Sequence, residues 1–474
     1  MRAEPTPGTT LRTARTLLKR APHPRPRPAN PSTRSAPTPT PTPTRSSATV
    51  IVSLLLSGCM GASADAGKIT LRFWGMGREG EVVAELMEGF EREHPDIDVV
   101  VQQIPWTAAH EKLLTSHVGN ASPDVAQLGN TWIPEFAAIH GLEPLAPWVA
   151  RSQAIGAEAY FPGIWATNFA EDTLFGVPWY VDTRVLFYRR DILAEAGYET
   201  VPESWQGWLD AMRAIKRDVG PDRYAIFLPT NEWMQPTVLG LQNGATLLRE
   251  NGTRGAFRDP RFAQAFDFYL QLFREGLAPP LGHYDIANPY QEFERGLFAM
   301  WITGPWNVGE FKRRLPPESQ DIWATAPMPG PTGAASGISH AGGASLVMFR
   351  SSEHKEAAWK LIEYLSRPEQ QIRFHELTGS LPARIEAWEQ SGLADDEHAR
   401  AFWTQLQRTR ALPAVPEIEA IVSQVIEHSE ASIRGTVPAV QALANLDADV
   451  DRLLEKRRWL LARRAAVADA GTEP

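Results

Sequence analysis

The sequence predicts an α/β fold built as two lobes, and three observations support this prediction. Between residues 69 and 128, stretches with period-two hydrophobicity alternate with stretches of helical periodicity, which is typical of helices packed on a parallel sheet. The chain has 474 residues, more than a single hydrophobic core usually holds. It contains one cysteine and no Cys and His cluster at metal-ligand spacing, so we expect neither disulfides nor a metal site.

The alternating region begins with a strand over 69–74, where apolar and polar side chains alternate. A glycine-rich turn follows, and apolar side chains then recur at helical spacing until Pro95 ends the helix. The elements predicted next are a strand at 97–104, a helix at 107–118 and a short strand at 124–128.

The rest of the chain is predicted mainly as helices, several of them rich in Trp and Phe. The predicted elements are helices at 203–219 and 259–275 around a loop at 229–237, strands at 297–302 and 342–349, and mostly helical segments at 353–377, 397–409 and 416–460. The last segment ends in a basic run between Lys456 and Arg464, which we interpret as a solvated face.

Cys59 stands at the end of a short apolar run that follows a basic residue, Arg45. A basic flank, an apolar core of about ten residues and small residues before a cut are the parts of a secretory signal. Residues 45–59 are therefore predicted to be a signal peptide. Their spacing resembles a bacterial lipobox, which implies lipidation of Cys59. The apolar run is shorter than the ~20 residues that a membrane-spanning helix needs.

Residues 1–47 are rich in Pro and Thr and cannot bury enough apolar surface to fold. They are either a disordered extension or the product of a translation start placed upstream of the true one. The chain is acidic overall, with a formal net charge of −9, although its first 59 residues are basic. An exported acidic protein is not expected to bind nucleic acid, or to contact a membrane except through a lipid anchor.

The motif Gly75-x-Gly77-x-x-Gly80 lies between a strand and a helix, as in dinucleotide-binding proteins. The second strand, however, ends in Gln102-Gln103-Ile104 and lacks the acidic residue that would bind the ribose. We therefore expect no nucleotide cofactor. The glycine turn instead brings Glu79 or Glu81 to a helix N-terminus, where they would either bind ligand hydroxyls or complement the helix dipole.

A series of motifs resembles extracellular solute-binding proteins of the maltose/trehalose class, the receptors of ABC sugar importers. The motifs are the opening from Ile69 to Trp148, then Gly176 to Asp182, Leu186 to Asp191, Pro202 to Trp205, Phe293 to Gly296, Gly304 to Trp306, Gly342-Gly343 and Leu377 to Arg384. The resemblance covers nearly all of residues 68–450. It implies a two-lobed periplasmic-binding-protein fold (type II-like) with a hinge between the lobes.

The resemblance also implies how the chain is divided and what it does. The implied division is an N-terminal lobe of 68–180 and 304–352, a C-terminal lobe of 181–303 and 353–465, crossings near residues 180, 303 and 352, and a tail at 466–474. The implied protein is a monomer without cofactor or catalytic activity, anchored by lipid in the periplasm or on the cell surface. It would close on an α-linked glucose disaccharide such as maltose or trehalose and deliver it to permease subunits with a cytoplasmic ATPase.

Candidate sugar-binding residues follow from the shape of a pyranose, which offers apolar faces to aromatic rings and hydroxyls to carboxylates, amides and guanidinium groups. The resemblance points to Tyr180, Asp182 and Arg384, although an ion pair between the lobes would also explain the last two. The other candidates are Glu79, Glu81, Gln127, Asn130, Trp132, Trp233, Gln235, Trp301, Trp306 and Gly343, with Trp106 a weaker one. For each Trp, packing in a core stays open as the alternative.

Other functions stay open as well. Ala344 stands where some disaccharide-binding relatives place a stacking tryptophan, which leaves the identity of the sugar undecided. A receptor for glycerol phosphate, a polyamine or a peptide is one alternative, although the Trp, Tyr, Gln and Asn candidates favour a neutral sugar. An exported glycoside hydrolase is another, but no carboxylate pair stands in a recognisable catalytic setting.

Overall fold

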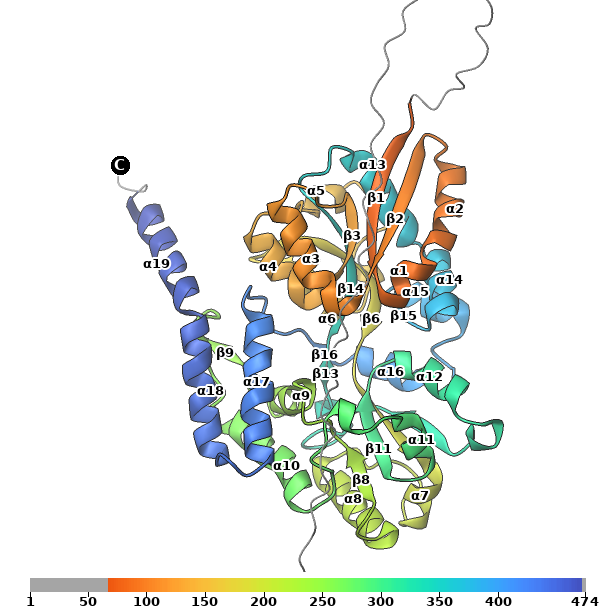
Figure 1. The fold of residues 1–474 in the computed structure, drawn as a ribbon, viewed down its shortest axis with the longest axis vertical. Helices are drawn as coiled ribbons and strands as arrows, with labels where there is room; N and C mark the ends of the chain where they lie inside the picture. Colours follow the sequence, from red (N-terminus) through yellow and green to blue (C-terminus); the bar gives the residue numbers. More distant parts are fainter. Residues whose placement is uncertain (1–66, 471–474) are drawn as a thin grey trace, which may run out of the picture. The chain divides into compact units, whose positions relative to one another are not determined.

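The computed structural model describes residues 67–470 and contains two main β-sheets (Figure 1). The predicted extension, the signal peptide and Cys59 lie outside the described residues. The first sheet has six strands, in the order β15 (Leu381–Pro382), β6 (Gly176–Asp182), β14 (Gly342–Met348), β3 (Val125–Gly129), β1 (Ile69–Met76) and β2 (Ile97–Ile104). We call this sheet and the helices packed on it the first lobe.

Strand β1 pairs in parallel with β2 and with β3, and β14 joins β3 to β6 in antiparallel pairing. All five residues of β3 are buried, as expected for a strand covered on both faces. The helices of this lobe are α1 (Gly77–Val82), α2 (Ala84–Glu93), α3 (Trp106–Val118), α4 (Ile133–Ala138), α5 (Ala146–Val149), α6 (Pro162–Ala166), α13 (Lys355–Leu365), α14 (Pro368–Thr378) and α15 (Ile385–Ser391). The predicted strand over 97–104 and the α/β character of the region are confirmed.

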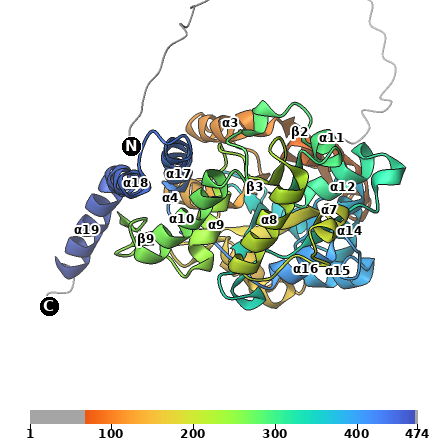
Figure 2. The ribbon, with the colours of Figure 1, turned by 90° about the horizontal axis from the view of Figure 1, so that it is seen from below.

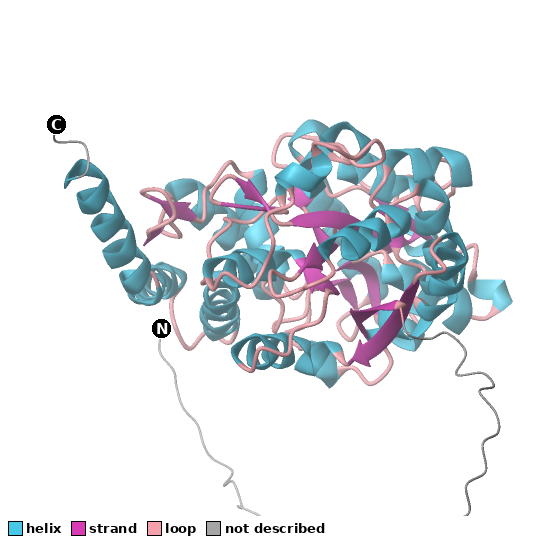
Figure 3. Ribbon diagram, turned by 90° about the horizontal axis from the view of Figure 1, so that it is seen from above, coloured by secondary structure: helices cyan, strands magenta, loops and turns pink. Residues whose placement is uncertain are grey.

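The second sheet has four strands, in the order β12 (Trp323–Ala326), β7 (Val185–Arg189), β11 (Phe298–Thr303) and β8 (Tyr224–Phe227). We call this sheet and its helices the second lobe. Figure 3 shows how the strands of the whole molecule lie among its helices. The helices are α7 (Arg190–Glu195), α8 (Trp205–Val219), α9 (Met234–Gln242), α10 (Pro260–Arg274), α11 (Pro289–Glu294), α12 (Trp306–Arg314) and α16 (Arg400–Leu406). The predicted loop at 229–237 ends earlier than expected, because α9 begins at Met234.

Three further helices follow the second lobe and lie together at one side of the molecule (Figure 2). They are α17 (Ile418–Ile433), α18 (Ala439–Leu453) and α19 (Glu455–Ala470). Helices α17 and α18 pack on each other and on α10, and α17 also contacts the short 3-10 helix Asn130–Trp132 of the first lobe. Within residues 67–470, no helix combines the length and the apolar character that crossing a membrane requires.

The chain leaves the first sheet after Asp182 and enters the second at Val185, so only Thr183 and Arg184 form this crossing. A second connection is a short ribbon in which β13 (Ser339–His340) pairs in parallel with β16 (Thr409–Arg410). Helix α9 of the second lobe contacts β13, and α6 of the first lobe contacts β16. We call these two strands the hinge ribbon, because they lie between helices of the two lobes.

The structure places two predicted lobe boundaries differently. Residues 304–352 were expected in the first lobe, but β12 pairs with β7 of the second sheet and α12 packs on α11. The chain therefore returns to the first sheet only between Ala326 and Gly342. The Gly-Pro-Trp segment at 304–306, interpreted as a crossing, instead begins α12.

The third boundary, expected near residue 352, also lies later. Helix α13 packs on β14 and β1, α14 packs on α1, and β15 pairs with β6, so the chain stays in the first lobe through α15. It enters the second lobe with α16, which contacts β12 and β7. Hydrophobic periodicity identifies a helix, but it does not show which of two sheets the apolar face will cover.

Candidate functional site

Polar side chains gather where β1, β3 and β6 of the first sheet end. Gln127 on β3 is fully buried, and its amide Nε2 donates to the hydroxyl of Tyr180 at 3.0 Å. Its Oε1 accepts from the backbone N–H of Met76 at 2.7 Å. Because both ends of the amide are engaged, Gln127 fixes the position of the Tyr180 hydroxyl.

Glu79, on the first turn of α1, faces the same place. Burial raises the pKa of its carboxyl group, while hydrogen bonds from Trp106, Tyr180 and Ser380 act in the opposite direction. The glycine turn before α1 makes this approach possible, since a Cβ on Gly75 would lie 2.6 Å from the Cα of Gly80. Glu79 thus presents a carboxylate surrounded by hydrogen-bond donors, an arrangement that suits the hydroxyls of a ligand.

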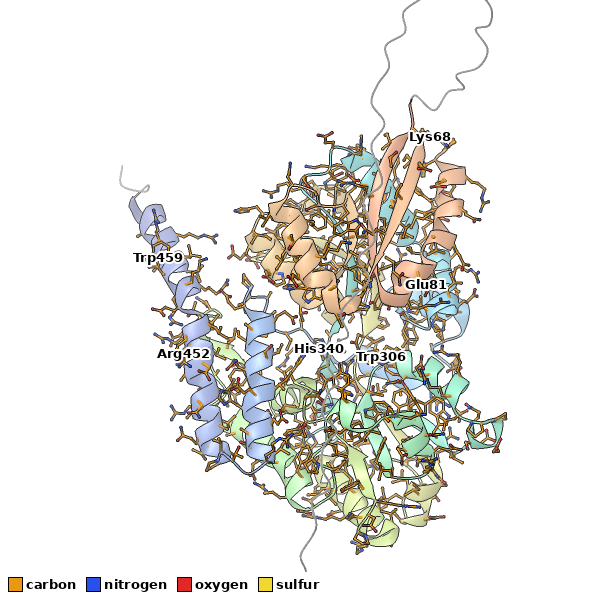
Figure 4. The ribbon with its side chains drawn as sticks, in the orientation of Figure 1. Lys68, Glu81, Trp306, His340, Arg452 and Trp459 are labelled. Carbon is orange, nitrogen blue, oxygen red and sulfur yellow. The ribbon has the colours of Figure 1, made fainter. Side chains whose placement is uncertain are left out.

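Glu81 lies two residues further along α1 and points elsewhere. It pairs with Arg78 at 3.0 Å, and both side chains are 57% exposed. Figure 4 labels Glu81 on α1, away from Trp306 and His340. Of the two carboxylates predicted at this helix, the structure therefore places only Glu79 with Tyr180.

Arg184 lies in the crossing between the lobes and connects several charged groups. Its guanidinium forms an ion pair with Asp182 and lies 4.7 Å from the ring centroid of Trp306. Burial raises the pKa of the Asp182 carboxyl, and Arg184 opposes this shift. Burial also acts to raise the pKa of Glu232. A hydrogen bond from His283 and the positive charge of Arg184 together have a larger, opposite effect, so the pKa of Glu232 is lowered. The result is a partly buried series of alternating charges at the crossing.

His340, on the hinge ribbon, completes this group. Its ring meets that of Trp233 edge to face, with centroids 5.4 Å apart. Burial lowers the pKa of His340 to about 3, and the nearby positive charge of Arg184 acts in the same direction. The imidazole is therefore neutral at physiological pH. Figure 4 shows His340 and Trp306 between the two sheets.

The candidate tryptophans separate into exposed and buried ones. Trp106 of the first lobe is 38% exposed and Trp306 of the second lobe is 44% exposed, so both keep ring surface available to a ligand. Trp132 packs edge to face on Trp106, with centroids 5.7 Å apart. Trp301 is only 4% exposed and packs among Phe227, Phe298, Tyr290 and Phe311. The structure therefore places Trp301 in the core of the second lobe, which is the alternative left open for each Trp rather than a contact with ligand.

Arg384 is also placed differently from the prediction. It is 8% exposed and donates to the backbone carbonyl of Ala154, pairs with Glu386 at 3.3 Å, and lies over the ring of Tyr160. These contacts hold Arg384 within the first lobe. It therefore forms no pair with Asp182, whose partner is Arg184.

Three further predicted residues have structural roles. Gly343 has a φ of +133°, and a Cβ there would lie 2.1 Å from the carbonyl oxygen of Tyr180, so glycine allows β14 to approach β6. Gln235 is 3% exposed within α9. Asn130 is 6% exposed and donates to the hydroxyls of Thr167 and Ser345. Its contacts lie inside the first lobe rather than beside Tyr180.

We call the group formed by Glu79, Trp106, Gln127, Tyr180, Asp182, Arg184, Glu232, Trp306 and His340 the candidate site. Four of the groups that contribute to the site were not predicted from the sequence: Arg184, Glu232, His340 and Ser380. Arg184 could have been found, since it lies two residues from Asp182 in the predicted crossing. Within residues 67–470, no group of three or more His, Cys, Asp or Glu side chains is arranged to hold a metal ion.

This chain is similar to known bacterial proteins in both sequence and structure. The family model of bacterial extracellular solute-binding proteins matches residues 76–372. The solved structure of the sugar-binding protein MalE from Xanthomonas citri shares 50% sequence identity, covers 83% of this chain and 99% of its own, and superposes with a TM-score of 0.80. The two sheets and this superposition confirm the predicted two-lobed α/β fold.

Two curated relatives span most of the chain. The diacetylchitobiose binding protein DasA of Streptomyces coelicolor is 25% identical over 80% of this chain and 88% of its own. An uncharacterized lipoprotein of Streptomyces antibioticus is 28% identical over 77% of this chain and 82% of its own.

Proposed function

The chain belongs to the family of bacterial extracellular solute-binding proteins, and on this premise we propose that it is the sugar receptor of an ABC importer. The observation that carries the proposal is the composition of the candidate site. One exposed tryptophan from each lobe, Trp106 and Trp306, accompanies the hydrogen-bonding groups of Glu79 and Tyr180. Aromatic rings can stack on the apolar faces of a pyranose, and charged or neutral hydrogen-bonding groups can bind its hydroxyls.

We propose an oligosaccharide, and as its simplest form an α-linked glucose disaccharide such as maltose or trehalose. The two exposed Trp side chains come from different lobes, so a ligand of at least two rings can contact both. The likeness to the sugar-binding MalE supports a sugar, and the relative that binds diacetylchitobiose supports a ligand of this length. Ligand contact from both lobes would stabilise a closed arrangement by hinge motion.

A solute with several negative charges fits the candidate site less well. Arg184 is the one arginine among the residues of the candidate site. It is already paired with Asp182 and lies near Glu232. A phosphate would need free cationic donors, because it carries up to two charges and accepts several hydrogen bonds. This charge balance favours a neutral sugar over glycerol phosphate.

The same proposal includes the destination of the sugar. The closed receptor would be recognised by permease subunits that work with a cytoplasmic ATPase. We further propose that lipid on Cys59 anchors the protein outside the cytoplasm; its likeness to a Streptomyces lipoprotein supports this. Metabolic labelling with a palmitate analogue, lost in Cys59→Ala, tests the anchor separately from ligand binding.

Ligand binding is tested by thermal shift and calorimetry with maltose, trehalose, diacetylchitobiose, glycerol phosphate, spermidine and short peptides. A ligand at a hundred times its dissociation constant adds about 2.7 kcal/mol of stability, which is readily detected. The matched variants are Glu79→Gln and Glu81→Gln, two substitutions on the same helix. We expect the first to raise the Kd of the sugar about tenfold, since a charged hydrogen-bonding group is lost, and the second to leave it unchanged.

Binding of the charged solutes alone would refute the sugar proposal but not the receptor fold. Equal effects of Glu79→Gln and Glu81→Gln would show that the candidate site is wrong. Absence of binding to every compound would remove support for a disaccharide receptor and return attention to larger glycans.

A further inference from the structure

A small cavity lies beside the hinge ribbon and shares one residue, His340, with the candidate site described above. Its volume is about 30 Å³. Asn130, Thr131 and Thr167 of the first lobe line one side, and His340 of the hinge ribbon lines another. The segment Ala411–Ala414, which follows β16 and leads into α17, completes the wall. The cavity therefore adjoins the first lobe, strand β13 of the hinge ribbon and the segment that follows β16.

Two side chains that line the cavity have a polar atom without a partner within residues 67–470. They are Oδ1 of Asn130 and Nδ1 of His340. Both residues are deeply buried, with exposed fractions of 6% and 3%. A buried polar atom of this kind costs free energy unless something hydrogen-bonds to it.

The orientation of the Asn130 amide follows from its neighbour. The hydroxyl of Thr167 donates to the carbonyl oxygen of Ile164 at 2.7 Å, so toward Asn130 it can only accept. The amide nitrogen of Asn130 must therefore face Thr167, and it also approaches the hydroxyl of Ser345 at 3.5 Å. This leaves Oδ1 as the free end of the amide, an acceptor that needs a donor.

We propose that this cavity is a hydration site of the hinge, in which bound water donates to Oδ1 of Asn130 and hydrogen-bonds to Nδ1 of His340. A water molecule needs about 10–15 Å³ of such volume and two to four polar partners, so the cavity holds about two. Water fits either tautomer of the neutral imidazole, because it both donates and accepts. The inference does not depend on which solute the protein binds.

The water site links the first lobe to the hinge ribbon. Asn130 belongs to the first lobe, whereas the ring of His340 packs on Trp233 of the second lobe. A direct hydrogen bond between Asn130 and His340 would fix their separation, but a bridging water lets it vary while both atoms keep a partner. The hinge ribbon can thus shift without exposing an unpaired polar group.

The first test is a crystal structure of the protein at a resolution that shows ordered water. We expect density within hydrogen-bonding distance of both Asn130 Oδ1 and His340 Nδ1. A direct Asn130–His340 hydrogen bond, a dry cavity, or density too large for water would overturn the proposal.

The second test is a double-mutant cycle with Asn130→Leu and His340→Leu, read by thermal unfolding. Each single variant removes one partner of the water, so Tm should fall by about 2 °C or more. The double variant should lose less than the sum, because no unpaired atom remains.

Asn168 provides the matched control. It is fully buried and its Oδ1 also lacks a partner within the described residues, but it does not line the cavity. Asn168→Leu combined with His340→Leu should therefore be additive. Additive effects for Asn130 and His340 as well would contradict a shared water. If a variant fails to fold, the crystal structure of the unsubstituted protein still decides.

Discussion

Trp301 and Trp306 are five positions apart in the sequence, and the structure predicts opposite consequences for their replacement by alanine. Trp301 is 4% exposed and touches four aromatic rings of the second-lobe core. Truncating a buried aromatic side chain of this size costs about 3–5 kcal/mol of folding free energy. At about 2–4 °C per kcal/mol, Trp301→Ala should lower Tm by about 10 °C.

Trp306→Ala should instead weaken ligand binding and leave the fold largely intact. Trp306 is 44% exposed, and its ring lies over the guanidinium of Arg184, with the cation 4.7 Å from the centroid. A stacked sugar face is worth about 0.5–1.5 kcal/mol, and the loss of a cation–π contact that orients Arg184 adds about 0.5–1 kcal/mol. A total near 2 kcal/mol corresponds to a Kd raised about 30-fold.

The assay is calorimetric titration with the best sugar from the ligand panel, together with thermal unfolding of each variant without ligand. Trp459→Ala is the control, since Trp459 is 57% exposed on α19, away from the candidate site (Figure 4). We expect this control to change neither Kd nor Tm appreciably. A Kd within twofold of the unsubstituted protein for Trp306→Ala would refute the role of this ring. An unchanged Tm for Trp301→Ala would refute its assignment to the core.

Two other predictions concern the strand pairing and the hinge. Gly343→Ala should lower the free energy of unfolding by about 3 kcal/mol in denaturant titration, because the new Cβ would lie 2.1 Å from the Tyr180 carbonyl oxygen. Gly197 also has a positive φ, +89°, but no atom lies within 4 Å of its added Cβ, so Gly197→Ala should lose only about 1 kcal/mol; equal losses would contradict the steric argument. His340, whose folded-state pKa is about 3, binds a proton near pH 6.5 only when unfolded. The stability gained by keeping His340 neutral is therefore present above pH 6.5 and is lost as the pH falls toward 3. We expect His340→Phe to make the free energy of unfolding less dependent on pH. Between pH 4 and 6, its slope against pH should fall by about 1.4 kcal/mol per pH unit. An unchanged slope would mean that His340 is accessible to protons in the folded protein.

The local elements of the fold could be predicted because their signals lie within a few residues. The strand predicted at 97–104 has the same bounds in the structure, and the helix predicted at 107–118 begins one residue earlier. Tyr180 and Gln127 were both predicted as site residues, and the structure joins them by a hydrogen bond. Gln127 was predicted because it lies near the carboxyl end of the third strand, where ligands are expected in α/β sheets.

Local signals could not predict which of two residues close in the sequence would face the candidate site. Glu79 and Glu81 lie on one short helix, about 200° apart around its axis, so they were bound to face different directions. Which of them meets Tyr180 depends on how α1 packs on β1. The partner of Asp182 likewise could not be predicted: an ion pair with Arg384 was one alternative, but Arg384 contacts Ala154 and Tyr160, and Asp182 pairs with Arg184.

The sequence by itself determined the α/β class, most of the strands and helices, and the types of side chain available for a polar ligand. These properties depend on side-chain periodicity and turn chemistry within short segments. Only the tertiary structure decided that β12 belongs to the second sheet, that α13 and α14 belong to the first, and that Trp301 is core whereas Trp306 is exposed. The physical reason is that an apolar face gains the same free energy from any apolar surface that fits it. The choice between two sheets is therefore made by contacts between segments more than a hundred residues apart.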